Sequence, residues 1–214
     1  HMLKQEGLDT LVTRFLGLDA PAPKLDEWEE VVHRLIHPKH RVKIGMIGKY
    51  IDLQDSYLSV NESLVHGGIR NDTGVEVIHL DAEAIERDGA EAHLKGLDGI
   101  LVPGGFGDRG IEGKILAANY ARTSKTPYLG ICLGLQVATI EFCRNVLNLT
   151  GANSTEFEDN PQYPAVIFMP EISKTHLGGT MRLGSRPTLW QVDDCKIRRL
   201  YGEGESVDER HRHR

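Results

Sequence analysis

The sequence predicts an α/β fold: an open, mostly parallel sheet with helices on both faces, preceded by a short helical connector. From position 42 onward, short apolar segments alternate with amphipathic ones. The apolar segments are continuous rather than interleaved with polar residues, which is typical of parallel strands that are buried on both faces. Two of these segments run directly into glycine-rich loops. Open sheets of this class bind their ligands beyond the carboxyl ends of the strands, so these loops are the first places to look for a site.

Residues 3–40 are expected to form the helical connector, and His1-Met2 is interpreted as an expression-tag remnant. Apolar side chains recur in this segment at the spacing of one helix face. They form two runs: Leu8, Leu11, Val12, Phe15 and Leu16, then Trp28, Val31, Val32, Leu35 and Ile36. Asp26 is the expected N-cap of the second helix, and Pro38 is expected to end it. Two short amphipathic helices before any strand favour a connector that packs on a neighbour.

Residues 41–214 are expected to form the α/β domain, with strands and helices in alternation. The apolar segments predict strands over 42–47, 75–80, 99–102 and 127–131. Helical periodicity between and after them predicts helices around 57–65, 82–95, 111–122 and 133–147.

Composition limits the possible classes of function. The chain has 214 residues, of which 40% are hydrophobic and 26% are charged, and its net charge is −6. That charge argues against nucleic acid or an anionic membrane as a partner. No apolar run approaches the roughly 18–20 residues that span a bilayer. The three cysteines, Cys132, Cys143 and Cys195, are too few and too scattered for a disulfide framework, which favours a cytoplasmic protein.

The strongest local signal is Gly130-Ile131-Cys132-Leu133-Gly134, where a predicted strand turns into a predicted helix. This is the nucleophile-elbow pattern with cysteine in the nucleophile position. The flanking glycines allow a sharp turn to pass close to neighbouring backbone. The helix that begins there favours the thiolate, and the N–H of Leu133 is available to hold an oxyanion. The alternative is a buried structural cysteine, the usual fate of a free thiol.

A second glycine-rich loop covers residues 103–110, again at the end of a predicted strand. Bare backbone N–H groups there could cradle a phosphate, but neither GxxxxGK[ST] nor a clean GxGxxG is present. The other interpretation is the second half of an oxyanion hole opposite Cys132. Because this strand precedes the nucleophile strand in the predicted order, the second interpretation fits better.

Several motifs together resemble the class I, triad-type glutamine amidotransferases. They are Pro-Gly-Gly-Phe-Gly at 103–107, Gly-Ile-Cys-Leu-Gly-Leu-Gln at 130–136 and Asn-Ser-Thr-Glu-Phe at 153–157. The segments 178–184 and 209–214 are similar to those of the CTP synthase branch, and so is the helical lead-in. The resemblance covers nearly the whole chain and departs from the branch at Leu135, where methionine is usual.

The resemblance implies a set of roles for residues of this sequence. Cys132 would attack the side-chain amide of L-glutamine and form a γ-glutamyl thioester. The backbone of Gly105 and Leu133 would hold the oxyanion, and Glu156 would hold the α-amino group of glutamine. The remaining expected oxyanion or substrate contacts are Phe106, Gly134, Leu135, Gln136 and Arg214.

The resemblance also implies cofactors and partners. The glutaminase reaction needs no cofactor, whereas ATP and Mg²⁺ belong to a synthetase domain that would precede residue 3 and converts UTP to CTP. GTP is the expected allosteric activator, acting near Arg182 and its loop. The whole enzyme is expected to be a homo-oligomer. The general base and its orienting acid are expected in a His-Pro-Glu motif several dozen residues beyond Arg214.

No histidine of this sequence lies in a motif that identifies it as the general base. His211 and His213 are interpreted as part of the glutamine or inter-domain surface, with His213 a weaker candidate for the base. His33, His37 and His40 have helical spacing, but they are expected on the solvated side of the connector, and no metal is predicted.

Two alternatives stay open on these residues. Within the enzyme class, the chain could be a glutaminase of another biosynthetic amidotransferase or a γ-glutamyl hydrolase. Outside it, a glutaminase-like domain could serve as a non-catalytic regulatory or assembly module.

Overall fold

The computed structural model describes residues 2–21, 23–49, 54–105, 107–168, 182–202 and 204–213, with only the backbone of Gln54, Arg212 and His213. Its internal contacts divide the chain into two units. The first comprises residues 1–41 and 63–75, and the second comprises residues 42–62 and 76–214.

The first unit is helical. It holds α1 (Met2–Gln5), α2 (Leu8–Phe15) and α3 (Asp26–Ile36), together with most of α4 (Leu58–Arg70). The two predicted connector helices are therefore confirmed, but α1, α2 and α3 contain no buried residue. The expected N-cap is wrong by one position, since α3 begins at Asp26 and Leu25 occupies the cap. Asp26 lies in the first turn of α3, where its carboxylate stabilises the helix by interacting with the positive end of the helix dipole.

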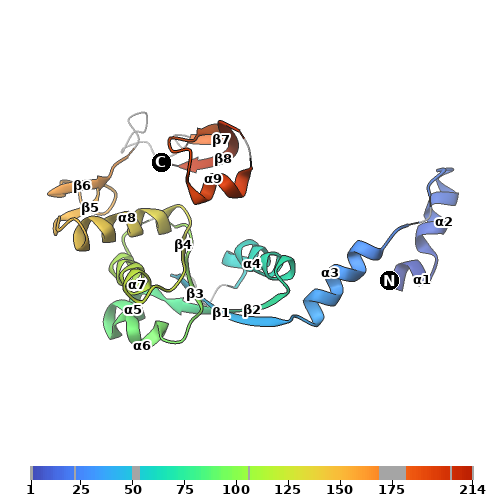
Figure 1. Cartoon of the computed structure of the whole chain (residues 1–214), viewed down its shortest axis with the longest axis horizontal. Helices are drawn as coiled ribbons and strands as arrows, with labels where there is room; N and C mark the ends of the chain where they lie inside the picture. The colour runs from blue at the N-terminus through green and yellow to red at the C-terminus, as the bar shows by residue number, and fades with distance from the viewer. Residues whose placement is uncertain are drawn as a thin grey trace. The chain divides into compact units, whose positions relative to one another are not determined.

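The predicted parallel sheet is confirmed. Its strands are β1 (His40–Gly48), β2 (Thr73–Asp81), β3 (Gly99–Val102) and β4 (Tyr128–Gly130), in the spatial order β2-β1-β3-β4 (Figure 1). β3 pairs in parallel with both β1 and β4, with Ile44 opposite Gly99 and Ile100 opposite Tyr128. β3 is buried along its whole length, which explains its unbroken apolar sequence.

The steps from β2 to β3 and from β3 to β4 run in the same direction across this sheet. Right-handed crossovers therefore put these two connections on the same face. Tyr57, in the 3-10 turn η1 (Gln54–Tyr57), stacks near His79 of β2, with ring centroids 6.1 Å apart.

The helices of the later connections enclose the core. They are α5 (Ala82–Asp88), α6 (Ala90–Leu94), α7 (Ile111–Ser124) and α8 (Leu133–Asn145). The single helix expected over 82–95 is wrong, because Gly89 adopts φ +87° and divides it into α5 and α6. α7 packs between α5 and α8, and all three contribute to one apolar cluster. The buried members of that cluster are Ile47, Ala82, Ile85, Leu94, Ile100, Val102, Ile111, Ile115, Ala117, Ala121, Leu133, Val137 and Ile140.

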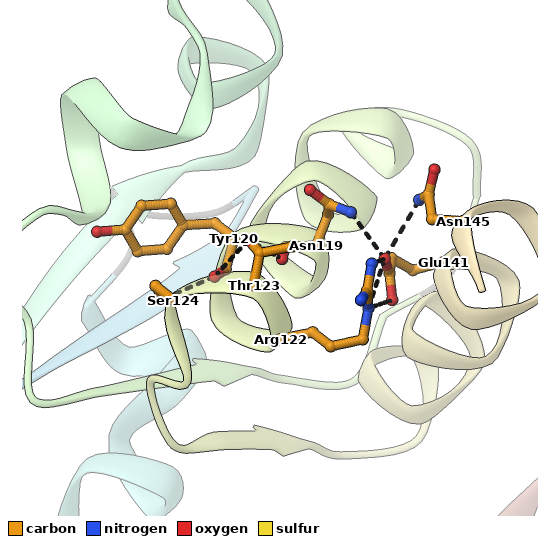
Figure 2. Close-up of polar contacts among 7 residues, drawn as sticks. All are labelled: Asn119, Tyr120, Arg122, Thr123, Ser124, Glu141 and Asn145. Atoms are coloured by element: carbon orange, nitrogen blue, oxygen red, sulfur yellow. Dashed lines mark hydrogen bonds and ion pairs between the residues drawn. The ribbon is translucent and has the colours of Figure 1, made fainter.

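A buried ion pair fastens α8 to α7 (Figure 2). The Glu141 side chain is 3% exposed and accepts hydrogen bonds from Arg122 Nη2 at 2.8 Å, Asn119 Nδ2 at 2.8 Å and Asn145 Nδ2 at 3.2 Å. Burial alone would raise the pKa of Glu141, but these hydrogen bonds, led by the one from Arg122, outweigh it and hold that pKa below its usual value. The helix that follows the nucleophile is thus anchored at its far half.

The region after α8 contains elements that the sequence did not predict. β5 (Ala152–Ser154) and β6 (Tyr163–Val166) form a short parallel pair. β7 (Arg182–Leu189) and β8 (Ser206–His213) form an antiparallel pair, and α9 (Lys196–Tyr201) lies in the connection between them. Among the described residues, no helix is long and apolar enough to cross a bilayer.

Candidate active site

The turn from β4 into α8 holds Cys132 in a strained backbone conformation. Cys132 has φ +53° and ψ −104°, a region that residues with a side chain adopt only when their surroundings impose it. Its thiol is free and half-buried. This confirms the predicted elbow geometry.

Both glycines of the elbow are required by close backbone contacts. A Cβ at Gly130 would lie 2.4 Å from the carbonyl carbon of Gly134, and a Cβ at Gly134 would lie 2.1 Å from the carbonyl oxygen of Val102. Since real Cβ atoms do not approach backbone this closely, neither position has room for a side chain. The start of α8 is therefore packed directly on the ends of β3 and β4.

The glycine-rich loop lies against this elbow. A Cβ at Gly104 would lie 3.5 Å from Cys132 Cβ, and one at Gly105 would lie 3.5 Å from Leu133 Cδ2. Within the described part of the chain, no hydrogen bond uses the N–H of Gly105 or Leu133. Two unused backbone donors thus lie on the elbow and on the loop packed against it, and an oxyanion hole requires such free donors.

Glu156 is brought to the same loop from 49 residues away in the sequence. Its Oε1 accepts a hydrogen bond from the N–H of Gly107 at 3.3 Å. Its own N–H donates to Oγ of the buried Ser154 at 3.2 Å, which fixes the turn after β5. The structure therefore places this half-buried carboxylate on the glycine-rich loop.

A cavity of about 640 Å³ opens at the nucleophile. One wall consists of Gly130, Ile131, Cys132 and Leu135, and the other of Tyr201, Glu209, Arg210 and His211. The Tyr201 hydroxyl donates to Glu209 Oε1 at 2.7 Å, and Thr188 Oγ1 donates to Glu209 Oε2 at 3.2 Å. These two hydrogen bonds lower the pKa of Glu209, so it faces the cavity as a carboxylate.

This second wall is the part of the site that sequence reasoning missed. The 209–214 motif contains Glu209 but implies no role for it. Tyr201 carries no sequence signal: it ends α9, in the connection between β7 and β8, and reaches the cavity beside Glu209. His211, expected on a glutamine or inter-domain surface, does line the cavity.

Some predicted site residues do not appear in this cavity. Gln136 lies half-buried in the first turns of α8 but is not part of the lining. Phe106, Arg214 and residues 178–181 lie outside the described residues, as does the side chain of His213. Arg182 begins β7 and is exposed.

The connector histidines are exposed, as expected, with the rings of His33 and His37 5.2 Å apart. Among the described residues, no group of three or more His, Cys, Asp or Glu side chains could hold a metal ion.

Near the glycine-rich loop, Lys114 is an unusual buried cation. It is 3% exposed, and its side chain makes no hydrogen bond or ion pair within the described part of the chain. Burial, reinforced by the nearby positive charges of Lys49 and Arg109, lowers the pKa of Lys114 from 10.5 to about 8. The charged amine therefore destabilises the native fold at neutral pH.

A Lys114→Met variant is expected to be more stable than the parent chain by about 2 kcal/mol at pH 7, because it removes this desolvated charge while keeping the unbranched shape. Between pH 8 and 10.5 the unfolded Lys114 binds more protons than the native one, so the parent chain gains stability as the pH rises. Urea unfolding of both proteins should show a smaller difference in the free energy of unfolding at pH 10 than at pH 7. A difference in the free energy of unfolding that does not change with pH would contradict this account of Lys114.

Comparison with known proteins decides the family. The profile of the family described as glutamine amidotransferase class-I matches residues 52–214. The chain belongs to the class-I glutamine amidotransferases. The elbow, the glycine-rich loop and Glu156 all lie within the matched region of this amidotransferase chain.

Curated relatives of the amidotransferase chain carry the name CTP synthase. The protein from Ruminiclostridium cellulolyticum is 51% identical over 214 residues, covering 100% of this chain and 40% of its own length. The protein from Carboxydothermus hydrogenoformans is 52% identical over 213 residues, covering 99% of this chain and 39% of its own length. The amidotransferase chain thus spans about 40% of the length of these relatives.

A solved structure shares the fold of the amidotransferase chain. The glutaminase domain of Trypanosoma brucei CTPS with bound acivicin superposes with a TM-score of 0.74 and is 38% identical. The match covers 81% of this chain and 67% of that one, and it confirms the predicted fold class.

Proposed function

We propose that this chain is the glutaminase domain of a CTP synthase and that it releases ammonia from L-glutamine through a cysteine thioester. The observation that carries the proposal is the elbow. Cys132 is held at φ +53° between two glycines that admit no side chain, beside a loop with an unused backbone donor. A merely structural cysteine needs none of these features.

The proposed chemistry is acyl transfer to sulfur. The Cys132 thiolate adds to the side-chain carbonyl carbon of glutamine, and the carbonyl oxygen becomes an oxyanion held by the N–H groups of Gly105 and Leu133. The carbon–nitrogen bond then breaks, and the nitrogen leaves with a proton as ammonia. Water cleaves the resulting thioester, which releases glutamate and restores the thiol. The thiol proton passes to a base, which the family resemblance identifies as the histidine of a His-Pro-Glu motif.

Substrate binding needs groups for the two charged ends of a free amino acid. We assign the α-ammonium group to Glu156, whose carboxylate lies on the glycine-rich loop beside Gly107. Arg214 and Phe106 are assigned to glutamine on the resemblance alone, and so are the supporting contacts of Gly134, Leu135 and Gln136. Leu135 lines the cavity at Cys132, which supports its assignment.

The wider setting of the reaction belongs to the same proposal. Ammonia would pass to a synthetase domain that uses ATP and Mg²⁺ to convert UTP to CTP. GTP would activate the glutaminase, and the whole enzyme would be a cytoplasmic homo-oligomer. The 51% and 52% identity to CTP synthases supports this setting over a γ-glutamyl hydrolase or the glutaminase of another synthetase.

Acivicin, the compound bound to the trypanosomal glutaminase domain, provides a direct test. We expect the chain to take up one acivicin on Cys132, with L-glutamine slowing the reaction and a Cys132→Ser variant remaining unlabelled. Peptide mass spectrometry locates the adduct. Cys143 and Cys195 are also free and partly accessible, so they serve as internal controls. Label on either of them instead of Cys132, or equal label on all three, would contradict the proposal.

A further inference from the structure

The first turn of α8 is wedged between two strand ends, and the peptide group of Gly134 is its tightest point. A Cβ at Gly130 would lie 2.5 Å from the Gly134 carbonyl oxygen, so that oxygen sits directly over the missing side chain of Gly130. The thiol of Cys132 is two residues before this peptide group. A movement of the Gly134 peptide group therefore changes the orientation of the Cys132 side chain.

Tyr128 reaches this carbonyl group. Its hydroxyl donates a hydrogen bond to the Gly134 oxygen at 2.8 Å. Tyr128 and Gly130 are two residues apart on β4, so they point to the same face of the sheet. The ring of Tyr128 thus approaches the helix from the strand side, through the space that the absent side chain at Gly130 leaves open.

The environment of Tyr128 keeps its hydroxyl a permanent donor. The ring packs against the apolar cluster of the second unit. Burial, with a smaller contribution from the Glu141 carboxylate, raises the pKa of the Tyr128 phenol. The phenol is therefore protonated at neutral pH and can donate this hydrogen bond.

The other hydrogen bonds at the elbow come from backbone. Ile131 N–H donates to the Val102 oxygen at 2.9 Å, and Gly134 N–H donates to the Ile131 oxygen at 3.0 Å. Within the described part of the chain, Tyr128 makes the only side-chain hydrogen bond to residues 130–134. The strained conformation of Cys132 persists only because several contacts impose it. Of these contacts, the hydrogen bond from Tyr128 is the one that a single side-chain substitution can remove.

We infer that Tyr128 is a positioning residue, whose hydroxyl holds the Gly134 carbonyl and so fixes the orientation of the Cys132 thiol for attack. The inference rests on the proposed glutaminase function. Tyr128 touches neither the thiol nor the cavity at Cys132, so it acts only through the first turn of α8.

Tyr128→Phe removes this one oxygen and leaves the ring in place. Tyr120→Phe is a matched control, since Tyr120 is also half-buried against the same cluster and its hydroxyl bonds to no described residue. In Figure 2 the Tyr120 ring points away from the Glu141 network.

The inactivation of Cys132 by acivicin gives a KI and a maximal rate, kinact, for each protein. We expect kinact to fall about fivefold in Tyr128→Phe, the effect of losing one ordinary hydrogen bond, with KI unchanged. Tyr120→Phe should match the parent chain in both constants. A purely structural role for Tyr128 would leave kinact unchanged below the unfolding temperature, and that result would overturn the inference.

Hydrogen–deuterium exchange separates this inference from the proposed function. Peptides spanning 131–137 should exchange about five times faster in Tyr128→Phe than in the parent chain or in Tyr120→Phe. If the parent chain takes no acivicin on Cys132, the proposed function fails, and the exchange result still decides whether Tyr128 holds the turn. Unchanged exchange in Tyr128→Phe would overturn the inference whatever acivicin does.

Discussion

A Gly134→Ala variant is expected to lose about 3 kcal/mol of free energy of unfolding, together with nearly all acivicin labelling of Cys132. The added Cβ would lie 2.1 Å from the carbonyl oxygen of Val102, and that oxygen belongs to the central strand β3, which cannot move away. The first turn of α8 must therefore shift, and the thiol shifts with it. Urea unfolding and peptide mass spectrometry measure the two effects.

Gly67→Ala is the matched control for this substitution. Gly67 also lies in a helix, α4, but a Cβ there would meet nothing within 4 Å. Alanine is the better helix former, so Gly67→Ala should raise the free energy of unfolding by about 0.5–1 kcal/mol and leave labelling unchanged. If Gly134→Ala behaved like Gly67→Ala, the close packing of α8 on β3 would be wrong.

Glu141→Ala is expected to lower the free energy of unfolding by about 2–3 kcal/mol at pH 7. It leaves Arg122, Asn119 and Asn145 without their shared acceptor (Figure 2). The expected loss is at the low end for a broken buried pair, since the Arg122 side chain is 37% exposed and can turn to solvent. Glu91→Ala removes an exposed carboxylate from the Lys95 ion pair and should leave the unfolding midpoint unchanged.

The loss in Glu141→Ala should depend on pH in a defined direction. The native pKa of Glu141 is lower than its unfolded value of about 4.3, so its charge stabilises the fold above that pH. This contribution disappears as the pH falls through the native pKa. The difference between the parent chain and Glu141→Ala should thus be constant above pH 5 or so and smaller at pH 3. A difference that grows on acidification would contradict the role assigned to the ion pair.

The elbow could be predicted because its determinants are local. A glycine on each side of Cys132, between an apolar strand and a helical run, specifies a turn that few other sequences tolerate. The sheet was predictable for a related reason, because a continuous apolar run such as 99–102 is stable only when it is buried on both faces at the centre of a domain.

The far wall of the cavity could not be predicted because its determinants are not local. β7 and β8 are exposed or charged along most of their length, so neither shows the apolar pattern of a buried strand. Their pairing, which places Glu209 in the wall opposite Cys132, is visible only in three dimensions, and so is the contact of Tyr201 at the end of α9 with Glu209. The N-cap predicted at Asp26 is off by one residue, which is the normal uncertainty of a helix end. The break at Gly89 was not predicted, because a single glycine within a helical pattern does not by itself end the helix.

The absence of any buried residue in α1, α2 and α3 has a practical consequence for biophysical work on this chain. Helices of this length are marginal in water unless a partner covers their apolar side. They therefore add little to the cooperative unfolding transition, which reports on the sheet and its helices alone. Substitutions at Phe15, which is 88% exposed, would not change a denaturation curve even where they weaken binding to a partner that covers this side chain.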